Sequence, residues 1–396
     1  MEVQERRIAS TFRRIVFVCF HGHANLATWF DSPLRMWMRN GCVVDIIVPK
    51  NVNYCNIPFS AHDGEVFLTG HPAQGVPRRV LSFVFQTIST IRRQKYSLIV
   101  AFDQIAVIAA GVAWHLFRIP YLYQCLELRL AQETRGLVRT ALKRMEDFYI
   151  RRAILSIVHG DLRAKLLSVD SKVPFSAVVS VPNSPLGPAN PEKCSYLRQK
   201  LNIPVESTIV LCAGSLARET KILEIAAYTP SWPQGFVLVL NGWGRPEYIK
   251  AVRDFAQMSD GRILVASDLL PLDLIDTLFA SADIGIALYG RESLNTRFVG
   301  ESAGKVFYYL KHGIPVIASD LPELRSVIER NRVGICVRNA GEIGGALTEI
   351  SMHYAEYREN AFAAFEKYEF SRWYKYVIVK AERRIKSRYG MQDSKR

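Results

Sequence analysis

One lysine of this 396-residue sequence follows a pattern that favours phosphate binding. Residues 300–306 read GESAGKV, and Ser302 is predicted to cap a helix over Ala303–His312 that ends at Gly313. The first amides of a helix lack intrahelical partners, and the helix dipole places partial positive charge at the same end. Lys305 adds a full charge, so the segment predicts a phosphate site. The alternative is an ordinary capped helix with a solvated lysine.

A glycine between two histidines forms a second candidate group. His21, Gly22 and His23 follow directly after an apolar run, Ile15–Phe20, that predicts a strand. Glycine allows the backbone to approach a pyrophosphate closely. Either histidine could donate to a phosphate or take a proton near neutral pH. A histidine satisfied by a neighbouring carbonyl is the alternative interpretation.

Several common kinds of site are excluded by missing motifs. The first strand is not followed by the GxGxxG of nicotinamide-binding enzymes, and GESAGKV is one residue too short for an NTP-binding P-loop, with Val306 where a hydroxyl belongs. No two aspartates stand at spacing two, so the DxD metal clamp is absent. The seven cysteines have no zinc-ligand spacing and are interpreted as buried thiols. We therefore expect neither a metal nor a cofactor.

Apolar segments of strand length alternate with helix-length periodic segments along the whole chain, which predicts an α/β protein with parallel sheets. The strands expected in the first half are Ile15–Phe20, Val43–Val48, Glu65–Leu68, Leu98–Phe102, Pro120–Cys125, Ile154–Val158 and Ala177–Val181. Those expected in the second half are Thr208–Ala213, Phe236–Leu240, Arg262–Ala266, Ile284–Leu288, Pro315–Ala318 and Gly334–Val337.

A proline-rich stretch, PNSPLGPANPEK, separates the two series of strands. It predicts Rossmann-like, doubly wound domains over residues 1–182 and 207–352, a linker over 183–206 and C-terminal helices over 353–396. Two such domains normally bind a ligand in an interdomain cleft at the carboxyl ends of their strands.

The net charge of +14 is unevenly distributed. Residues 1–182 carry 23 Lys and Arg against 13 Asp and Glu, whereas residues 183–396 carry 28 against 24. Arg135, Arg139 and Lys143 recur at every fourth position, so on a helix they share one face. That face could be merely solvated, or it could attract anionic lipid or a phosphate-bearing acceptor. We expect no nucleic acid, because no recognised binding motif accompanies the charge.

The apolar segments indicate a cytoplasmic protein. Ile15–Phe20 is too short for a signal-peptide core, and Leu98–Phe117 is interrupted near its start by Asp103 and Gln104, so it is too short to span a bilayer. Scattered unpaired cysteines favour a reducing compartment. Peripheral contact with the inner face of the membrane is compatible with the basic first half.

The run ADIGIALYGRESLNTRFVGESAGKVFYYLKHGIPVIASDLPELRSVI, from Ala282 to Ile328, resembles the donor-binding region of the retaining GT-B glycosyltransferases of glycosyl transferases group one. That family has an "AD" strand followed by an "NK-LFEY-AAG-PVIAS" helix and strand. The positions in step with it are Asp283, Asn295, Lys305, Tyr309, Gly313 and Pro315. RIPYLYQCLELRLAQE, LCAGSLARETKILEIA and RILVASDLLPLDLIDTLFASAD also resemble family segments, so the similarity covers nearly the full length.

The resemblance implies a GT-B fold whose C-terminal helices cross back onto the first domain. It implies transfer of a sugar from a nucleotide diphosphate sugar to a glycan or lipid-linked acceptor, without metal and with retention of configuration. The catalytic residues implied are His23, Glu127 and Lys305. The donor-binding residues implied are Gly22, Gly214, Ser215, Arg218, Lys221, Gly242, Asp268, Leu269, Asn295, Glu301, Ser302, Gly304 and Tyr308.

The sequence departs from the family pattern at three positions. Tyr308 stands where many members have a ribose-binding glutamate, Leu126 replaces the histidine of "HEL", and Ser215 replaces a phosphate-loop arginine. A phenol cannot grip a diol in the bidentate manner of a carboxylate. A catalytically silent protein that binds a sugar nucleotide or a protein partner is therefore the alternative function. A nucleotide-sugar epimerase on the same fold is a third hypothesis.

Overall fold

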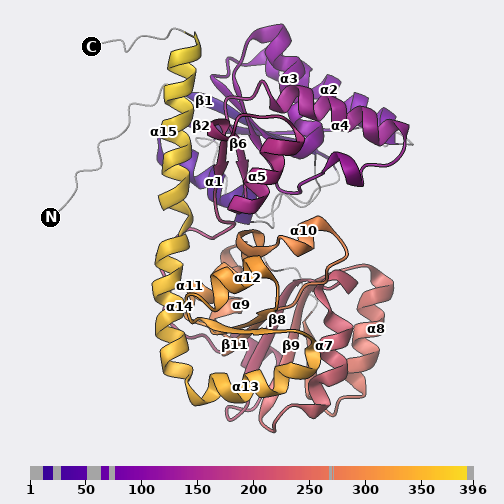
Figure 1. Cartoon of the computed structure of the whole chain (residues 1–396), viewed down its shortest axis with the longest axis vertical. Coiled ribbons are helices and arrows are strands. Elements are labelled where there is room, and N and C mark those ends of the chain that lie inside the picture. Colours follow the sequence, from indigo (N-terminus) through magenta and orange to yellow (C-terminus); the bar gives the residue numbers. More distant parts are fainter. Residues whose placement is uncertain are drawn as a thin grey trace, which may run out of the picture. The chain divides into compact units, whose positions relative to one another are not determined.

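The structure is a computed structural model that describes residues 12–20, 28–50, 64–70, 76–266, 270 and 272–389. The chain forms two compact units, each with its own parallel sheet (Figure 1). Unit 1 comprises Met1–Val181 together with Ser371–Arg396, and unit 2 comprises Pro182–Phe370.

Unit 1 contains a seven-stranded sheet in the order β3-β2-β1-β4-β5-β6-β7. Its strands are β1 (Arg14–Cys19), β2 (Val43–Pro49), β3 (Val66–Thr69), β4 (Leu98–Phe102), β5 (Tyr121–Gln124), β6 (Ser156–Val158) and β7 (Val178–Ser180). The central strands β1 and β4 pair in parallel from Ile15 beside Leu98 to Cys19 beside Phe102. Both strands are almost entirely apolar and buried, as expected of a parallel sheet covered on both faces.

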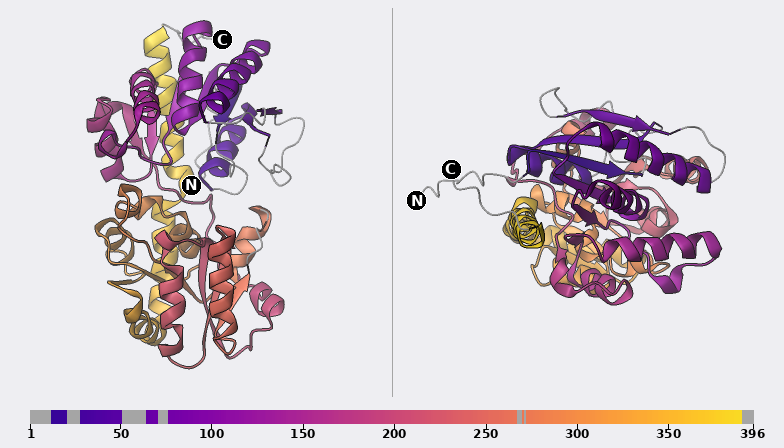
Figure 2. Two further views of the ribbon diagram at one scale, coloured as in Figure 1. Left: turned by 90° about the vertical axis from the view of Figure 1, so that its right-hand side faces the viewer. Right: turned by 90° about the horizontal axis from the view of Figure 1, so that it is seen from above.

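Six α-helices accompany this sheet in the described residues. They are α1 (Thr28–Arg39), α2 (Val76–Arg93), α3 (Asp103–Phe117), α4 (Leu137–Ile150), α5 (Asp161–Asp170) and α15 (Phe370–Tyr389). Helix α3 is apolar on nearly all sides, and α2 and α4 both pack against it on one side of the unit (Figures 1 and 2). The chain between α3 and α4 contains β5 and a short 3-10 helix, Ala131–Glu133.

Helix α15 completes the core of unit 1. Its buried side chains include Tyr374, Val377 and Ile385. The indole nitrogen of Trp37 donates to the Tyr374 hydroxyl over 3.3 Å. These two residues are 337 positions apart in the sequence. Helix α15 therefore packs against α1, which comes much earlier in the chain.

Unit 2 contains a six-stranded parallel sheet in the order β10-β9-β8-β11-β12-β13. Its strands are β8 (Thr208–Ser215), β9 (Phe236–Trp243), β10 (Ile263–Ala266), β11 (Ile284–Ala287), β12 (Val316–Ser319) and β13 (Gly334–Val337). Its helices are α6 (Tyr196–Leu201), α7 (Ile222–Tyr228), α8 (Pro246–Gln257), α9 (Leu272–Ala280), α10 (Leu294–Arg297), α11 (Gly304–Lys311), α12 (Pro322–Ile328), α13 (Ile343–Met352) and α14 (Tyr354–Tyr368).

Two apolar cores lie on the two faces of this sheet because the side chains of each strand alternate between them. One core contains Leu211 with Phe307 of α11 and Phe365 of α14, and the other contains Cys212 with Val252 of α8. Both faces are thus covered by helices, which is the doubly wound arrangement.

All thirteen strands expected from the sequence are present, with ends that differ by at most three residues. Residues 183–206 are ordered against unit 2, where Asn190 N–H donates to Lys311 O and Cys194 N–H donates to Ala280 O. Helix α14 belongs to unit 2, whereas the chain from Ser371 belongs to unit 1. In the stretches that the structure describes, no helix combines the length and the apolarity needed to cross a bilayer.

Candidate functional site

Two glycines shape the carboxyl edge of the unit 2 sheet. Gly214 is the next-to-last residue of β8 and has a φ of +105°, and Gly242, beside it on β9, has a φ of +153°. A Cβ at Gly242 would overlap the Gly214 carbonyl oxygen. Both positions therefore require glycine, and together they leave backbone rather than side chains at this edge.

Lys305 lies against this edge. A Cβ at Gly214 would be 3.5 Å from Lys305 Cε and 3.7 Å from its Nζ, and Nζ lies 5.5 Å from the centroid of the Tyr289 ring. The ammonium is buried and has no hydrogen-bond partner among the described residues, although the residue as a whole is of intermediate exposure. Burial lowers the pKa of Lys305 below its usual value. A buried cation without a partner is costly, so the position is suited to binding an anion.

The helix that carries Lys305 begins differently from the prediction. Helix α11 starts at Gly304, and Ala303, not Ser302, is its N-cap residue. The expectation that Ser302 caps the helix was wrong, because its hydroxyl donates to Val299 O over 2.6 Å and no side chain caps the helix. The Ala303 amide is not free either, since it donates to Gly300 O. Because the Val306 amide donates to Ala303 O, the orphan amides of the first turn are those of Gly304 and Lys305.

Asn183 lies at the same helix start and was missed by the sequence analysis. Its Nδ2 donates to Ser302 O over 3.1 Å, and its backbone N–H donates to Glu301 O. Its Oδ1 is buried and has no hydrogen-bond partner in the part of the chain that the structure describes. A Cβ at Gly304 would lie 3.0 Å from Asn183 Nδ2, so the glycine permits this close contact. The one signal in the sequence was a polar residue between the prolines of the expected linker.

The loop after β8 carries the expected phosphate-loop cations. Arg218 is exposed on a short 3-10 helix, Arg218–Thr220, and Ser215 O accepts from the Thr220 hydroxyl over 2.8 Å. Lys221 Nζ donates to Glu224 over 2.8 Å, which raises the pKa of Lys221. It also lies 3.8 Å from Glu292. Lys221 is therefore already paired, unlike Lys305.

The remaining donor-binding candidates of unit 2 lie on α10, on α11 and just before α11. Asn295 is in the short helix α10, and Glu301 is in the 3-10 helix Gly300–Ser302. Tyr308 stacks on Phe279, with ring centroids 4.8 Å apart and an interplanar angle of 13°. The phenol at this position thus has an aromatic neighbour from α9.

In unit 1, Glu127 lies on the loop after β5 and is exposed, with its carboxylate 3.8 Å from Arg129. Asp103 anchors this loop, because its Oδ1 accepts from the amides of Leu126 over 2.7 Å and Glu127 over 3.3 Å. Asp103 is buried and adopts a left-handed φ of +62° at the start of α3. Its position directly after a strand was the only sign of this role in the sequence.

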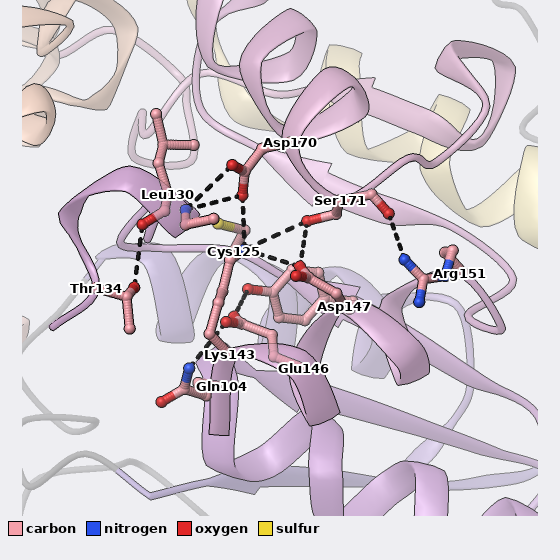
Figure 3. Close-up of polar contacts among 12 residues, drawn as sticks. Gln104, Cys125, Leu130, Thr134, Lys143, Glu146, Asp147, Arg151, Asp170 and Ser171 are labelled. Atoms are coloured by element: carbon pink, nitrogen blue, oxygen red, sulfur yellow. Dashed lines mark hydrogen bonds and ion pairs between the residues drawn. The ribbon is translucent and has the colours of Figure 1, made fainter. Parts of the chain in front are cut away.

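A polar network fixes the far end of the same loop (Figure 3). Lys143 Nζ lies 2.8 Å from Asp147 and 2.9 Å from Asp170, and Asp170 accepts from the Ala131 amide. Both interpretations of a face shared by Arg135, Arg139 and Lys143, a solvated face or one that attracts an anionic surface, require an exposed Lys143, and this was wrong because its side chain is only 4% exposed. The ion pairs with these carboxylates offset the cost of burying the Lys143 ammonium.

Glu146, next to this network, links three elements. It accepts from Gln104 Nε2 over 2.9 Å and from the Tyr123 hydroxyl over 2.8 Å, also drawn in Figure 3. Burial raises the pKa of Glu146, although Lys143 and the two donors act in the opposite direction. These bonds tie α4 to α3 and β5 behind the loop that carries Glu127.

Four predicted site residues lie outside the described residues: Gly22, His23, Asp268 and Leu269. The other candidates fall in two groups. Glu127 is in unit 1, and the donor-binding candidates that the structure describes are in unit 2. Within unit 2, the structure brings Gly214, Gly242, Gly304 and Lys305 together.

Comparisons with known proteins agree with this architecture. Residues 282–381 match the family described as glucosyltransferase 3-like, C-terminal domain. A sucrose-phosphate synthase from Thermosynechococcus elongatus superposes with a TM-score of 0.71 at 16% identity, covering 96% of this chain and 99% of that one. No curated protein matches the sequence.

Two further solved structures are similar over most of their length. HepE from Anabaena, solved in complex with UDP-glucose, has a TM-score of 0.69 at 15% identity, covering 96% of this chain and 100% of that one. WaaG, a glycosyltransferase involved in lipopolysaccharide biosynthesis, has a TM-score of 0.67 at 13% identity, covering 92% and 98%. These likenesses establish the GT-B fold. Together with the match over residues 282–381, most of which lie in unit 2, they identify the chain as a glycosyltransferase of GT-B architecture.

Proposed function

We propose that the chain transfers a sugar from a nucleotide diphosphate sugar to a hydroxyl of a glycan or lipid-linked acceptor, without a metal and with retention of configuration. The observation that carries this proposal is the buried, unpartnered ammonium of Lys305 beside Gly214 at the start of α11. A diphosphate bound there would neutralise the ammonium and accept from the first amides of the helix.

The proposed donor site lies at the carboxyl edge of the unit 2 sheet. The diphosphate contacts Lys305, the Gly214–Ser215 backbone and the cations of the loop after β8, Arg218 and Lys221. The nucleotide base lies against residues 267–269, and the acceptor is presented by Glu127 and His23 of unit 1. The remaining donor-side contacts come from Gly22, Gly242, Asp268, Leu269, Asn295, Glu301, Ser302, Gly304 and Tyr308.

In the proposed reaction, the bond between the anomeric carbon and the diphosphate oxygen breaks while a bond to the acceptor oxygen forms on the same face of the sugar. The departing diphosphate takes the acceptor proton, so charge and atoms balance without a further reactant. Lys305 and the helix amides stabilise the negative charge that develops on the diphosphate, the role that a metal ion has in other transferases.

The proposed setting is the cytoplasm, with peripheral contact at the inner face of an anionic membrane and a role in surface polysaccharide or lipid-linked glycan synthesis. The excess of basic residues over residues 1–182 supports attraction to anionic lipid. WaaG, which resembles this chain in fold, is described as acting in lipopolysaccharide biosynthesis.

A thermal-shift screen of UDP-, GDP-, ADP- and dTDP-sugars tests the donor site. UDP-glucose is the first donor to try, because HepE was solved with it. A ligand at about 100 times its dissociation constant stabilises the folded state by about 2.7 kcal/mol. We expect Lys305→Ala to remove the shift and Lys250→Ala, at an exposed lysine of α8, to leave it intact. A full shift in the Lys305→Ala variant would contradict the proposed site.

The second candidate is a protein that binds a sugar nucleotide or a protein partner without transfer. Two observations favour it: Tyr308 packs on Phe279 where a carboxylate was expected, and Lys221 is already paired with Glu224. Incubation with the donor that gives the largest shift distinguishes the two. A transferase releases free nucleotide and sugar slowly by transfer to water, whereas a binding protein returns intact donor.

A further inference from the structure

Helix α2 presents apolar side chains between arginines on its exposed side. Leu81 is 69% exposed and Phe85 is 76% exposed, although both are large apolar residues. Arg78 and Arg92 lie on the same face of the helix as these two residues, and Arg79 and Arg93 are their neighbours in the sequence. Helix α2 has no acidic residue. We call Arg78, Arg79, Leu81, Phe85, Arg92 and Arg93 the α2 stripe.

Helix α4 has a second stripe of the same composition. Leu137 is 92% exposed, and Met145 and Phe148 follow it at exposed positions on the same face. Arg144 is exposed nearby, and the guanidinium of Arg152 lies 3.6 Å from the centroid of the Phe148 ring. The acidic residues of α4, Glu146 and Asp147, face the polar network with Lys143 and Gln104 instead.

The two stripes belong to one side of unit 1, because α3 packs against both helices and all three lie together in Figure 1. Leu116, at the end of α3, is exposed as well. Within the described part of the chain, no hydrogen bond or ion pair engages the side chains of Arg78, Arg79, Arg92 and Arg93. These guanidinium groups are therefore available to bind phosphate bidentately.

This combination selects the kind of partner. Apolar side chains flanked by unpaired arginines are typical of helices that lie in the interface of an anionic bilayer, where the apolar groups enter the acyl boundary and the cations meet lipid phosphates. The surface of an ordinary protein partner carries both positive and negative groups. It would therefore leave some of these arginines without an anionic partner. The absence of acidic residues along α2 also removes repulsion from an anionic surface.

We propose that the exposed faces of α2 and α4 dock unit 1 onto an anionic lipid bilayer. The face differs from the one expected from Arg135, Arg139 and Lys143, because Lys143 is buried. This inference rests on the proposed function for its biological setting, since a membrane-docked unit 1 would meet a lipid-linked acceptor at the bilayer surface.

Flotation with vesicles of phosphatidylcholine, with and without phosphatidylglycerol, tests the proposal on the full chain. We expect binding only to the phosphatidylglycerol vesicles, weakened by salt. An arginine near an anionic surface contributes roughly a factor of five to the partition coefficient, so Arg78→Gln with Arg79→Gln should lower it about 25-fold. Leu81→Ser with Phe85→Ser should lower it at least about tenfold, because both side chains would enter the bilayer.

Matched controls are available on α8 of unit 2 and at Met258, the residue that follows this helix. Lys250→Gln with Arg253→Gln removes two exposed cations, and Met258→Ser removes a side chain that is 74% exposed, similar to Phe85. These controls should bind as the unmodified chain does. The proposal is overturned if the chain does not bind phosphatidylglycerol vesicles, if both α2 variants bind normally, or if the controls lose binding equally.

The donor thermal shift, measured on the same proteins without vesicles, separates this proposal from the function. All stripe variants should retain the shift, because none of their substitutions is at the donor site. A retained shift with no vesicle binding overturns the docking surface and leaves the transferase proposal standing. Vesicle binding that follows these predictions, together with no shift for any donor, supports the docking surface and contradicts the donor site.

Discussion

Lys305 illustrates a residue whose environment is organised for a ligand rather than for the stability of the fold. Its ammonium is buried against Gly214 and Tyr289, and the described residues offer it no acceptor. Binding of a diphosphate would raise the lowered pKa of Lys305 again, because an adjacent anion favours the charged form. Donor binding should therefore be accompanied by proton uptake wherever free Lys305 is partly deprotonated.

Lys305→Met should raise the free energy of unfolding at neutral pH by about 1–3 kcal/mol, the usual cost of a buried polar group without a partner. The pKa of Lys305 is lower in the folded chain than in the unfolded chain, so between the two values the unfolded chain binds more protons. The stability of the unmodified chain should thus rise with pH across that interval, and the variant should lack this rise. Urea unfolding at several pH values measures both effects. Lower stability of the methionine variant would contradict this account.

The sequence predicted that Lys305 lies at the start of a helix, but it did not reveal which residues surround it. The glycine and lysine of GESAGKV indicate a helix start with a cation, which the structure bears out. The capping role assigned to Ser302 failed because a 3-10 turn, Gly300–Ser302, precedes the helix and directs the hydroxyl back to Val299 O. Asn183, more than a hundred positions earlier, is brought to this helix by tertiary structure that spacing cannot reveal.

At the scale of elements, the loop after β5 is fastened at both ends. Asp103 accepts from the amides of Leu126 and Glu127, and Asp170 accepts from the amide of Ala131. The four-residue periodicity of Arg135, Arg139 and Lys143 predicted a shared helix face, but α4 begins at Leu137, after Arg135, and periodicity does not say which face of a helix is buried. The carboxylates that pair with Lys143 include that of Asp170, which belongs to a different helix, α5.

Asp103→Ala should lower transferase activity at least about tenfold while leaving the donor thermal shift unchanged. The reason is that the amides of Leu126 and Glu127 lose their acceptor, so the position of Glu127 becomes less defined. Asp103→Asn should retain more activity, since an amide oxygen still accepts and asparagine tolerates the left-handed backbone. Steady-state assays of both variants with donor and acceptor varied separately check this. Equal activity of the alanine and unmodified proteins would show that Asp103 does not position the loop.

At the scale of the whole molecule, the two units differ in whether they are formed from one continuous segment of the chain. Unit 2 is one continuous segment, whereas unit 1 is completed by the chain from Ser371. The alternation of strands and helices predicted both sheets, because buried parallel strands have strongly apolar sequences. It did not predict that α14 and α15 would belong to different units, since both helices have sequences rich in aromatic residues.

Truncation after Phe370 should destabilise unit 1 by several kcal/mol, because it removes the buried side chains of Tyr374, Val377 and Ile385. Unit 2 keeps all its residues and should still give the donor thermal shift. Limited proteolysis followed by mass spectrometry would locate the change. Rapid cleavage within residues 182–370, with residues 76–181 protected, would contradict this prediction.

The discontinuity of unit 1 also has a consequence for biosynthesis. A chain emerging from the ribosome has all of unit 2 before it has α15, so the second unit can reach its native state first. Until α15 has been synthesised, Trp37 lacks the phenol of Tyr374, and the apolar side chains of unit 1 that pack against α15 stay open to chaperones or to aggregation. Nascent chains stalled before α15 emerges should accordingly be the species most dependent on folding assistance.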